Sequence, residues 1–310
     1  MKNLLIMSEM PEFLISLFDE TYNTYKVWLS DDKNEFITNI QAEIDAIAVM
    51  GGTIVSADLM KSMPNLKIVG CYGVGYDAID VNFAKENGIK VTNTPEVLND
   101  EVADTAISLM LAVYKKIIDA EKFARNNSWI NGEFPLARKF SGTKLGIVGM
   151  GRIGKAIAKR ADSFGCEISY HSRNKKDVSY KYFENVNKLA EEVDTLCIIT
   201  PGGKDTEKLI NLETFKHLGK NGVIINVARG SVIDQEAMIH CLKENLILGA
   251  GLDVYTNEPN IPKELIELHN TVLLPHIGSA TIETRRAMGQ LVFDNISAYF
   301  ENKGLITPVV

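Results

Sequence analysis

Short runs of apolar, largely β-branched residues recur along the chain, and segments long enough for amphipathic helices separate them. Buried strands of parallel sheets have such continuous apolar runs, and regular alternation with helices is typical of βαβ units. The pattern therefore predicts an α/β chain with doubly wound parallel sheets. The predicted strands are Leu4 to Met7, Ala46 to Met50, Leu66 to Cys71, Ile89 to Thr92, Leu145 to Gly149, Thr195 to Thr200, Gly222 to Val227 and Thr271 to Leu274.

Two longer helical patterns interrupt this alternation. The first extends from Asn99, at an acidic start that suits a helix N-terminus, to about Trp129. The second extends from Thr281 to Lys303, and Gly304 follows it as a stop signal. Two long helices that bracket a central block indicate an inserted domain. We therefore predict a central domain over residues 99–284 and a discontinuous domain made of residues 1–98 and 285–310.

Composition narrows the class of protein. With 310 residues and 45% hydrophobic content, the chain can bury one large core or two ordinary ones. A formal net charge of −7 argues against nucleic acid or an anionic membrane surface as a partner. No run approaches the ~20 apolar residues that span a bilayer.

The cysteines show neither a CxxC motif nor the Cys/His spacing of a zinc site. We therefore expect no metal and no disulfide framework, and a reducing, cytoplasmic location fits best. The four are Cys71, Cys166, Cys197 and Cys241.

A glycine-rich turn lies between an apolar strand and an amphipathic helix in residues 144–156. Gly149, Gly151 and Gly154 form a GxGxxG pattern around Arg152 and Ile153. In this context the glycines allow a tight turn, close approach of a pyrophosphate and close packing of helix on strand. The helix start then offers amides to the pyrophosphate. The turn predicts dinucleotide binding in a Rossmann-like domain.

The segment from Glu167 to Ser172 is predicted as the second strand, and its end lies at the position that selects the adenosine ribose. NAD-preferring proteins carry a carboxylate there, whereas this chain has Ser172 and Arg173, with Lys175 nearby. A hydroxyl and a guanidinium can bind a 2′-phosphate. We therefore favour NADP(H), with Arg173 as the main contact. Exposed contacts of this kind contribute only ~1 kcal/mol to the binding free energy, so use of NAD(H) stays an alternative. A second alternative is that these charged side chains are only solvated and bind no cofactor.

Four further motifs fall at the ends of predicted strands, the edge at which open α/β sheets bind ligands. They are Cys71-Tyr72-Gly73-Val74-Gly75-Tyr76-Asp77, Asn226-Val227-Ala228-Arg229-Gly230, Gly251-Leu252-Asp253-Val254-Tyr255 with Glu258-Pro259, and Pro275-His276-Ile277-Gly278-Ser279-Ala280-Thr281. With the glycine turn, these motifs resemble the D-isomer-specific 2-hydroxyacid dehydrogenase family, which includes glyoxylate/hydroxypyruvate reductases and 3-phosphoglycerate dehydrogenase. The resemblance covers nearly the whole chain, and the motifs follow the family's order and spacing.

The resemblance implies catalytic roles for three residues. Arg229 matches the arginine that grips the carboxylate and carbonyl oxygen of a 2-oxo acid. His276 matches the group that donates a proton to the alkoxide in reduction, and Glu258 matches its carboxylate partner. By the same resemblance residues 1–98 and 285–310 form the substrate-binding domain, and residues 99–284 bind the dinucleotide.

The resemblance also implies binding positions. Tyr72, Gly73, Val74 and Gly75, together with Arg229 and His276, match positions that bind the substrate. Positions that line the cofactor, besides the glycine turn and Ser172 to Lys175, are Thr200, Pro201, Val227, Ala228, Arg229, Asp253, His276 and Gly278.

The most direct interpretation is an NAD(P)H-dependent reductase of glyoxylate, hydroxypyruvate or a larger 2-oxo acid. One alternative is an NAD-linked dehydrogenase of a D-2-hydroxy acid or of 3-phosphoglycerate. Another is a nucleotide-sensing scaffold like the family's transcriptional corepressors. The resemblance further implies a homodimer, formed by the region from Asn99 to Trp129.

Overall fold

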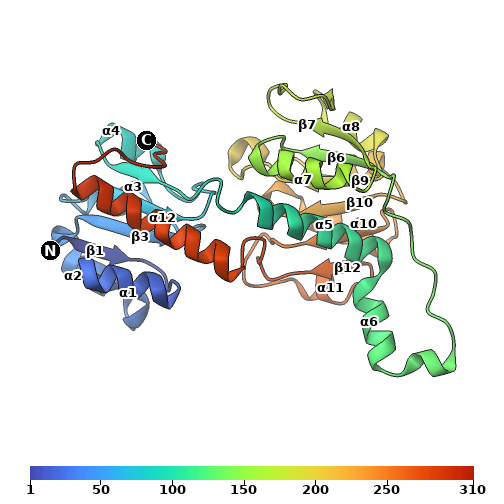
Figure 1. Cartoon of the computed structure of the whole chain (residues 1–310), viewed down its shortest axis with the longest axis horizontal. Coiled ribbons are helices and arrows are strands. Elements are labelled where there is room, and N and C mark those ends of the chain that lie inside the picture. The colour runs from blue at the N-terminus through green and yellow to red at the C-terminus, as the bar shows by residue number, and fades with distance from the viewer. The chain divides into compact units, whose positions relative to one another are not determined.

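The structure is a computed structural model that describes residues 1–310. The chain forms two compact units (Figure 1): unit 1 is Met1–Leu98 with Ser279–Val310, and unit 2 is Asn99–Gly278. The expected boundary after residue 284 falls inside helix α12 (Ile282–Phe300). The units instead separate before Thr281, whose side chain caps that helix, so the rigid helix belongs entirely to unit 1.

Unit 1 is built on a five-stranded sheet in the order β2-β1-β3-β4-β5. Its ladders are all parallel. In the central strands β3 and β4 the side chains on both faces of the sheet are buried, as the continuous apolar runs predict. The strands are β1 (Asn3–Ile6), β2 (Asn23–Lys26), β3 (Ala46–Met50), β4 (Ile68–Tyr72) and β5 (Lys90–Thr92).

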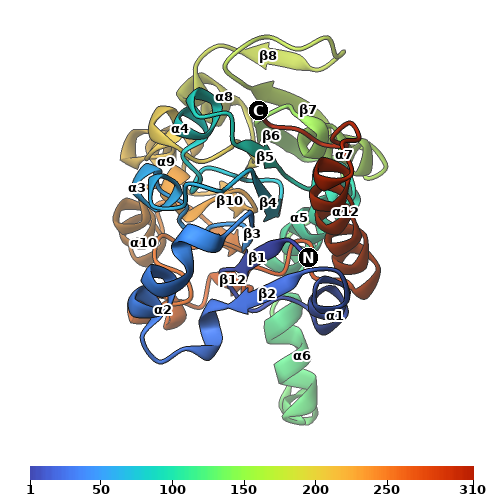
Figure 2. The ribbon, with the colours of Figure 1, turned by 90° about the vertical axis from the view of Figure 1, so that its left-hand side faces the viewer.

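Helices cover both faces of this sheet (Figure 2). Helices α1 (Glu12–Thr21) and α12 lie on one face, and α2 (Lys33–Ile40), α3 (Ala57–Lys61) and α4 (Val81–Glu86) lie on the other. α12 packs closely on β4 because Gly70 has no side chain: a Cβ there would come within 2.9 Å of Ile296.

Unit 2 is built on a seven-stranded sheet in the order β12-β11-β10-β9-β6-β7-β8, again with parallel ladders only. The chain runs from β6 outwards to β8 and then returns to β9 on the other side of β6, so the switch point of this doubly wound sheet lies between β6 and β9. The strands are β6 (Lys144–Val148), β7 (Glu167–His171), β8 (Lys181–Phe183), β9 (Thr195–Ile198), β10 (Val223–Asn226), β11 (Gly249–Leu252) and β12 (Thr271–Leu273).

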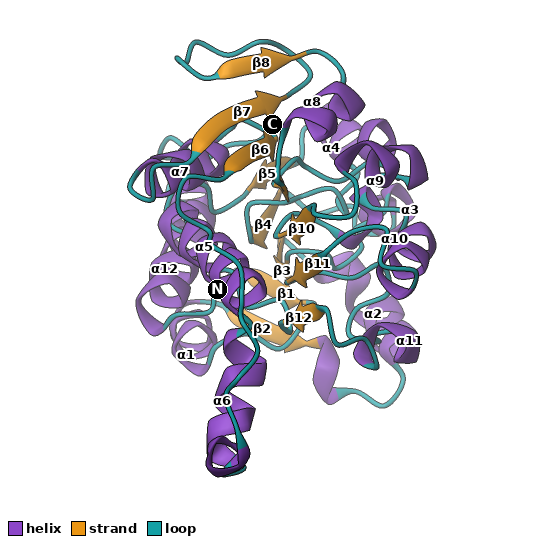
Figure 3. Ribbon diagram, turned by 90° about the vertical axis from the view of Figure 1, so that its right-hand side faces the viewer, coloured by secondary structure: helices purple, strands orange, loops and turns teal.

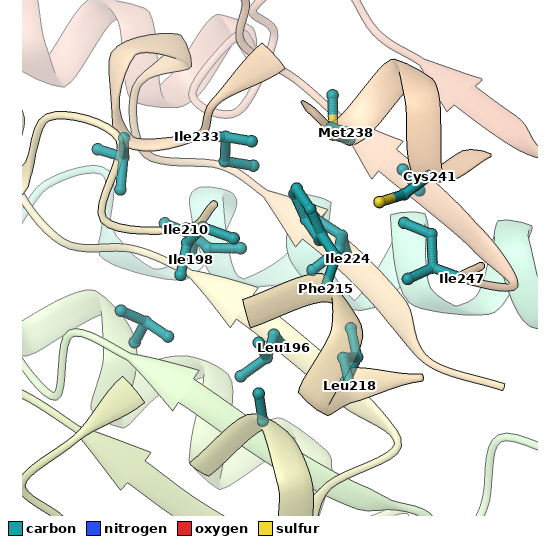
Figure 4. Packing of buried hydrophobic residues seen from close by; sticks show 14 of the residues in the cluster. Leu196, Ile198, Ile210, Phe215, Leu218, Ile224, Ile233, Met238, Cys241 and Ile247 are labelled. Carbon is teal, nitrogen blue, oxygen red and sulfur yellow. The ribbon is translucent and has the colours of Figure 1, made fainter. Parts of the chain in front are cut away.

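Helices α5 (Asn99–Lys115) and α7 (Arg152–Asp162) cover one face of this sheet, and α8 (Val186–Glu192), α9 (Leu212–Leu218) and α10 (Gln235–Lys243) cover the other (Figure 3). The short helix α11 (Lys263–Ile266) precedes β12. On the second face a buried cluster joins Leu196 and Ile224 of the sheet to Phe215, Met238 and Cys241 of the helices (Figure 4). This core holds the carboxyl ends of β9 and β10 in place.

The helical pattern predicted from Asn99 to about Trp129 is not one helix. α5 ends at Lys115, Lys116 adopts a left-handed conformation with φ 50°, and α6 (Ile117–Arg125) starts in a new direction. The physical reason is burial: α5 buries an apolar stripe in unit 2, whereas α6 has no buried residue. Figure 1 shows α6 extending away from the sheet of unit 2.

Three strands were not predicted from the sequence. β2 and β8 lie at sheet edges and have polar residues, so they lack a continuous apolar run. β11 has the sequence Gly-Ala-Gly-Leu, which lacks β-branched residues. Its glycines are nevertheless required by packing, since a Cβ on Gly251 would lie 2.9 Å from Ile225 and 3.0 Å from Leu109. None of the helices combines the length and apolar character that a membrane crossing requires.

Candidate active site

The glycine turn follows β6 at the switch point of the seven-stranded sheet. Gly149 has φ 113°, and a Cβ there would lie 2.8 Å from the backbone of Ile199 and Thr200. A Cβ on Gly154 would lie 2.2 Å from the carbonyl oxygen of Gly149. Both positions therefore exclude side chains, one by backbone conformation and both by close packing. The turn is thereby held against the end of β9.

The middle glycine has a different surrounding. A Cβ on Gly151 would meet no atom within 4 Å, so the backbone of the turn borders open space there. Gly151 is also the N-cap of α7, and as a glycine it has no side chain that could cap the first turn of that helix. Open space beside the positive end of a helix fits the pyrophosphate of a dinucleotide.

The loop after β7 is ordered by two internal hydroxyl groups. The wholly buried Tyr170 uses its hydroxyl to accept from the amide of Lys176 at 2.8 Å and to donate to its carbonyl at 3.1 Å. The Ser172 hydroxyl donates to the carbonyl of Asn174 at 2.9 Å. A preformed loop of this kind presents its charged side chains at defined backbone positions.

The cations of this loop are at the surface, and Arg173 is 82% exposed in its side chain. One guanidinium nitrogen of Arg173 lies 3.9 Å from a carboxylate oxygen of Asp205, which follows β9. Sequence reasoning missed Asp205, because only the folding of two parallel strands brings that residue to Arg173. Lys175 is also exposed.

A histidine and a glutamate form a hydrogen-bonded pair at the carboxyl edge of the sheet. Nδ1 of His276, which follows β12, lies 2.7 Å from Oε2 of Glu258, in the loop after β11. The other oxygen of Glu258 accepts from the amide of Tyr255 at 3.0 Å. Tyr255 in turn donates its hydroxyl to the carbonyl of Leu274 at 2.9 Å. These bonds hold the carboxylate in one orientation and aim it at the imidazole ring.

Charge at this pair favours the carboxylate form of Glu258. Partial burial acts to raise the pKa of Glu258. Hydrogen bonds from His276 and from the amide of Tyr255, with the positive charges of His276 and Arg229, outweigh it and hold the pKa below its ordinary value of 4.5. Glu258 is therefore ionised at neutral pH and can stabilise a protonated imidazole.

Asp253, at the end of β11, shapes the turn that carries the histidine. Its two carboxylate oxygens accept from the amides of Ile277 at 2.7 Å and Gly278 at 2.8 Å. These bonds help to hold His276 at φ 54°, which is an uncommon conformation for a residue with a side chain. Burial raises the pKa of Asp253, partly opposed by the same two amides. Asp253 thus acts on the backbone of this turn.

Arg229 lies in the turn after β10, and the buried side chain of Asn226 holds the backbone of this turn through hydrogen bonds. Asn226 is 1% exposed; it accepts from the amide of Ala228 at 3.0 Å and donates to the carbonyl of Arg229 at 3.0 Å. A Cβ on the next residue, Gly230, would lie 1.9 Å from the carbonyl carbon of Tyr255. The arginine turn therefore packs directly on the turn that holds Glu258. Asn226 could have been found from the sequence as a polar residue that ends an otherwise apolar strand.

Other expected cofactor positions lie at the same edge, since carboxyl ends of parallel strands meet there. Thr200 and Pro201 follow β9, next to Gly149. Val227 and Ala228 are 7% and 4% exposed, so their side chains are largely turned into the protein and their backbone is what they can offer a ligand.

The loop Gly73–Val74–Gly75 belongs to unit 1, where it follows β4. The Tyr72 side chain does not fit the expected contact with substrate. It is 1% exposed and its hydroxyl donates to the carbonyl of Arg285 in α12 at 2.8 Å, so it packs inside unit 1. The chain has no group of three or more His, Cys, Asp or Glu side chains arranged to hold a metal ion.

A GxGxxG turn at the switch point of a parallel sheet, with a histidine–carboxylate pair and an arginine at the same edge, defines a dinucleotide-dependent oxidoreductase. The family model described as "D-isomer specific 2-hydroxyacid dehydrogenase, NAD binding domain" matches residues 107–278. Glyoxylate/hydroxypyruvate reductase A of Arabidopsis thaliana is 43% identical over 307 residues, which cover 99% of this chain and 98% of the relative. The chain belongs to the D-isomer specific 2-hydroxyacid dehydrogenase family, as its motifs indicate.

Two further similarities bear on substrate and cofactor. Hydroxyphenylpyruvate reductase of Plectranthus scutellarioides is 43% identical over 309 residues, which cover 99% of this chain and 98% of the relative. A crystal structure of an NADPH-dependent glyoxylate/hydroxypyruvate reductase from Sinorhizobium meliloti, in complex with NADP and malonate, has a TM-score of 0.92 and 39% identity. That similarity covers 100% of this chain and 97% of the other.

Proposed function

We propose that this protein is a reductase that uses NADPH to convert a small 2-oxo acid, of the glyoxylate or hydroxypyruvate type, into the 2-hydroxy acid, which is the D-isomer where carbon 2 becomes chiral. The observation that carries the proposal is the His276–Glu258 pair at the sheet edge that also holds Arg229 and the glycine turn. The names of the relatives from Arabidopsis thaliana and Sinorhizobium meliloti support the substrate class.

A reduced nicotinamide dinucleotide, when bound, supplies the hydride for this reaction. Arg229 binds the substrate carboxylate and polarises the ketone, since its guanidinium is planar and permanently charged. Nδ1 of His276 is engaged by Glu258, so Nε2 is the ring nitrogen that remains to donate a proton to the developing alkoxide. Glu258 stabilises the protonated ring before that transfer. In the reverse direction, the neutral ring accepts the proton.

We propose that residues 1–98 and 285–310 act as the substrate-binding domain, through the amides of the loop Gly73–Gly75. Successive amides in such a turn can form a small anion-binding concavity. Unit 2, which lies within the predicted range of residues 99–284, would act as the dinucleotide-binding domain. Residues 279–284 belong to unit 1 together with α12.

We propose that the loop after β7 gives the protein a preference for NADPH over NADH. Arg173 and Lys175 supply positive charge, the Ser172 hydroxyl lies beside them, and no carboxylate follows β7 directly. The nearby Asp205 carboxylate limits the preference, because it would repel a 2′-phosphate. NAD(H) is therefore expected to be used as well, with lower efficiency.

The test is a set of parallel assays that follow oxidation of NADPH or NADH with glyoxylate, hydroxypyruvate and 4-hydroxyphenylpyruvate. D-glycerate and D-3-phosphoglycerate with NAD⁺ cover the NAD-linked alternatives. We expect turnover of at least one 2-oxo acid, faster with NADPH. Turnover of none of the five acids would favour the nucleotide-sensing scaffold. His217→Ala, at an exposed position in α9, provides a matched histidine control.

We further propose a homodimer formed through the segment from Asn99 to Trp129 and the loop that follows. This segment presents large apolar side chains to solvent: Trp129 is 73%, Ile130 75% and Leu136 96% exposed. Large apolar side chains exposed to this extent are typical of interfaces. Light scattering should give twice the mass of one chain, and the mass of a single chain at micromolar concentration would contradict the dimer.

A cytoplasmic location is proposed as well. The four cysteines are buried as free thiols, a state that a reducing compartment preserves. Fractionation of cells that express the tagged chain would test the location.

A further inference from the structure

Two carbonyl groups of the loop Gly73–Val74–Gly75 are held by the segment that follows β5. The amide of Thr94 donates to the carbonyl of Gly73 at 3.0 Å. The Asn93 side-chain amide donates to the carbonyl of Val74 at 2.8 Å. Because the peptide unit is planar and trans, a carbonyl and the next N–H point in opposite directions within one rigid group. These two bonds therefore also set the directions of the amides of Val74 and Gly75.

Asn93 is itself held by Thr307, from a distant part of the sequence. The Thr307 hydroxyl donates to the backbone carbonyl of Asn93 at 2.6 Å. The backbone amide of Asn93 in turn donates to the carbonyl of Thr307 at 3.4 Å. Asn93 is only 9% exposed. The position of its side chain is thus coupled to the position of the segment Ile306–Val310.

That segment is anchored by a buried side chain of α12. Asn295 is fully buried; its side-chain oxygen accepts from the amides of Ile306 and Thr307 at 3.0 Å each. Its side-chain amide donates to the Thr307 hydroxyl at 2.9 Å. Thr307 therefore both donates and accepts through one oxygen, which uses the hydroxyl fully.

The rest of the segment runs beside β5. Pro308 forms an antiparallel bridge with Thr92, and the amide of Val309 donates to the carbonyl of Val91 at 2.7 Å. A continuous series of hydrogen bonds leads from α12 through Thr307 and Asn93 to Val74. All its members lie in unit 1, so the series is independent of the placement of unit 2.

We infer that Thr307 and Asn93 are positioning residues for substrate binding. They hold the amides of Val74 and Gly75 in the orientation that receives a carboxylate, and Asn295 anchors them. The inference rests on the proposed function for the identity of the ligand. Its physical basis is preorganisation: amides already aimed at the anion need no reorientation when it binds.

The test compares Thr307→Val with Thr307→Ser. Valine has nearly the shape of threonine but leaves the Asn93 carbonyl and the Asn295 amide without their shared partner, whereas serine keeps the hydroxyl. For Thr307→Val we expect the KM for the best 2-oxo acid to rise about fivefold or more, the effect of losing one hydrogen bond. The Kd for NADPH should stay within about twofold of wild type, because unit 2 is untouched.

Hydrogen exchange measured by mass spectrometry supplies a second readout. In Thr307→Val, peptides that cover residues 70–77 should exchange faster, and in Thr307→Ser they should match the wild type. Thr38→Val is the control: it removes an exposed hydroxyl that bonds only the carbonyl of Asn34 in α2. It should change neither KM nor this exchange.

The outcomes separate this inference from the proposed function. If Thr307→Val lowers Tm but leaves both KM and exchange at residues 70–77 unchanged, the hydroxyl is merely structural and the inference is overturned. If the wild type turns over no 2-oxo acid, the proposed function fails. The exchange comparison then still decides whether Thr307 holds the loop.

Discussion

Glu258 contacts His276 through one carboxylate oxygen, Oε2, at 2.7 Å, and its other oxygen is engaged by the amide of Tyr255. The two residues are separated by 18 positions and follow neighbouring strands. A carboxylate held on both oxygens cannot turn away from the ring, so the pair is prepared before substrate binds.

Removal of the His276 imidazole should abolish most of the catalytic activity. For His276→Ala we expect kcat to fall by about 10²- to 10⁴-fold, because the alkoxide loses its proton donor. Glu258→Gln keeps the shape but loses the charge, and its kcat should fall less. Steady-state kinetics and NADPH titration by fluorescence measure both effects, and NADPH binding should persist. Full activity in His276→Ala would refute the assigned role.

The lowered pKa of Glu258 predicts a pH dependence of stability. A carboxylate whose folded-state pKa lies below its ordinary value of 4.5 stabilises the fold above that pH, and the contribution is lost as pH falls through the folded-state pKa. The difference in free energy of unfolding between wild type and Glu258→Gln should therefore shrink as pH falls below about pH 4.5.

Urea unfolding at a series of pH values measures this difference. Glu244→Gln, at an exposed position after α10, serves as the control and should show no such change. A difference for Glu258→Gln that grows towards acid pH would have the wrong sign for the lowered pKa.

The contact between Arg173 and Asp205 predicts opposite changes in cofactor preference. Arg173→Ala should lower the ratio of kcat/KM for NADPH to that for NADH, by less than about tenfold for an exposed charge. Asp205→Asn should raise the same ratio, since it removes a negative charge close to the guanidinium. Lys188→Ala changes an exposed cation on α8 and is the control. An unchanged ratio in both variants would mean that these side chains are only solvated.

Close packing at Gly230 predicts that even one methyl group is harmful there. In Gly230→Ala the Cβ would meet the backbone of Tyr255 at 1.9 Å, so the turns of Arg229 and Glu258 must separate. We expect a loss of about 1–3 kcal/mol in stability, as for other overpacked sites, together with a fall in kcat. Gly304→Ala adds the same group where nothing lies within 4 Å, and its Tm and kcat should match those of wild type.

Local sequence determined much of the architecture. Eight strands were placed from apolar runs, and the glycine turn was located because its strand, turn and helix are contiguous. The carboxyl ends of parallel strands lie at one edge of a sheet, so the residues after β10 and β12 could be assigned to one site from the sequence. The motif after β11 was placed there by its resemblance to the family, since β11 itself was not predicted. The family membership followed from the order and spacing of these motifs.

Tertiary structure decided what depends on neighbours distant in sequence. Packing in unit 2 ended α5 at Lys115, and burial under α12 turned the Tyr72 side chain away from its expected role. The partners of Arg173, Val74 and Thr307 are set by which strands and segments lie side by side. Periodicity and spacing report the propensity of each segment and the face that it buries. They do not report which remote hydroxyl, carboxylate or backbone carbonyl the folded chain brings within hydrogen-bonding distance.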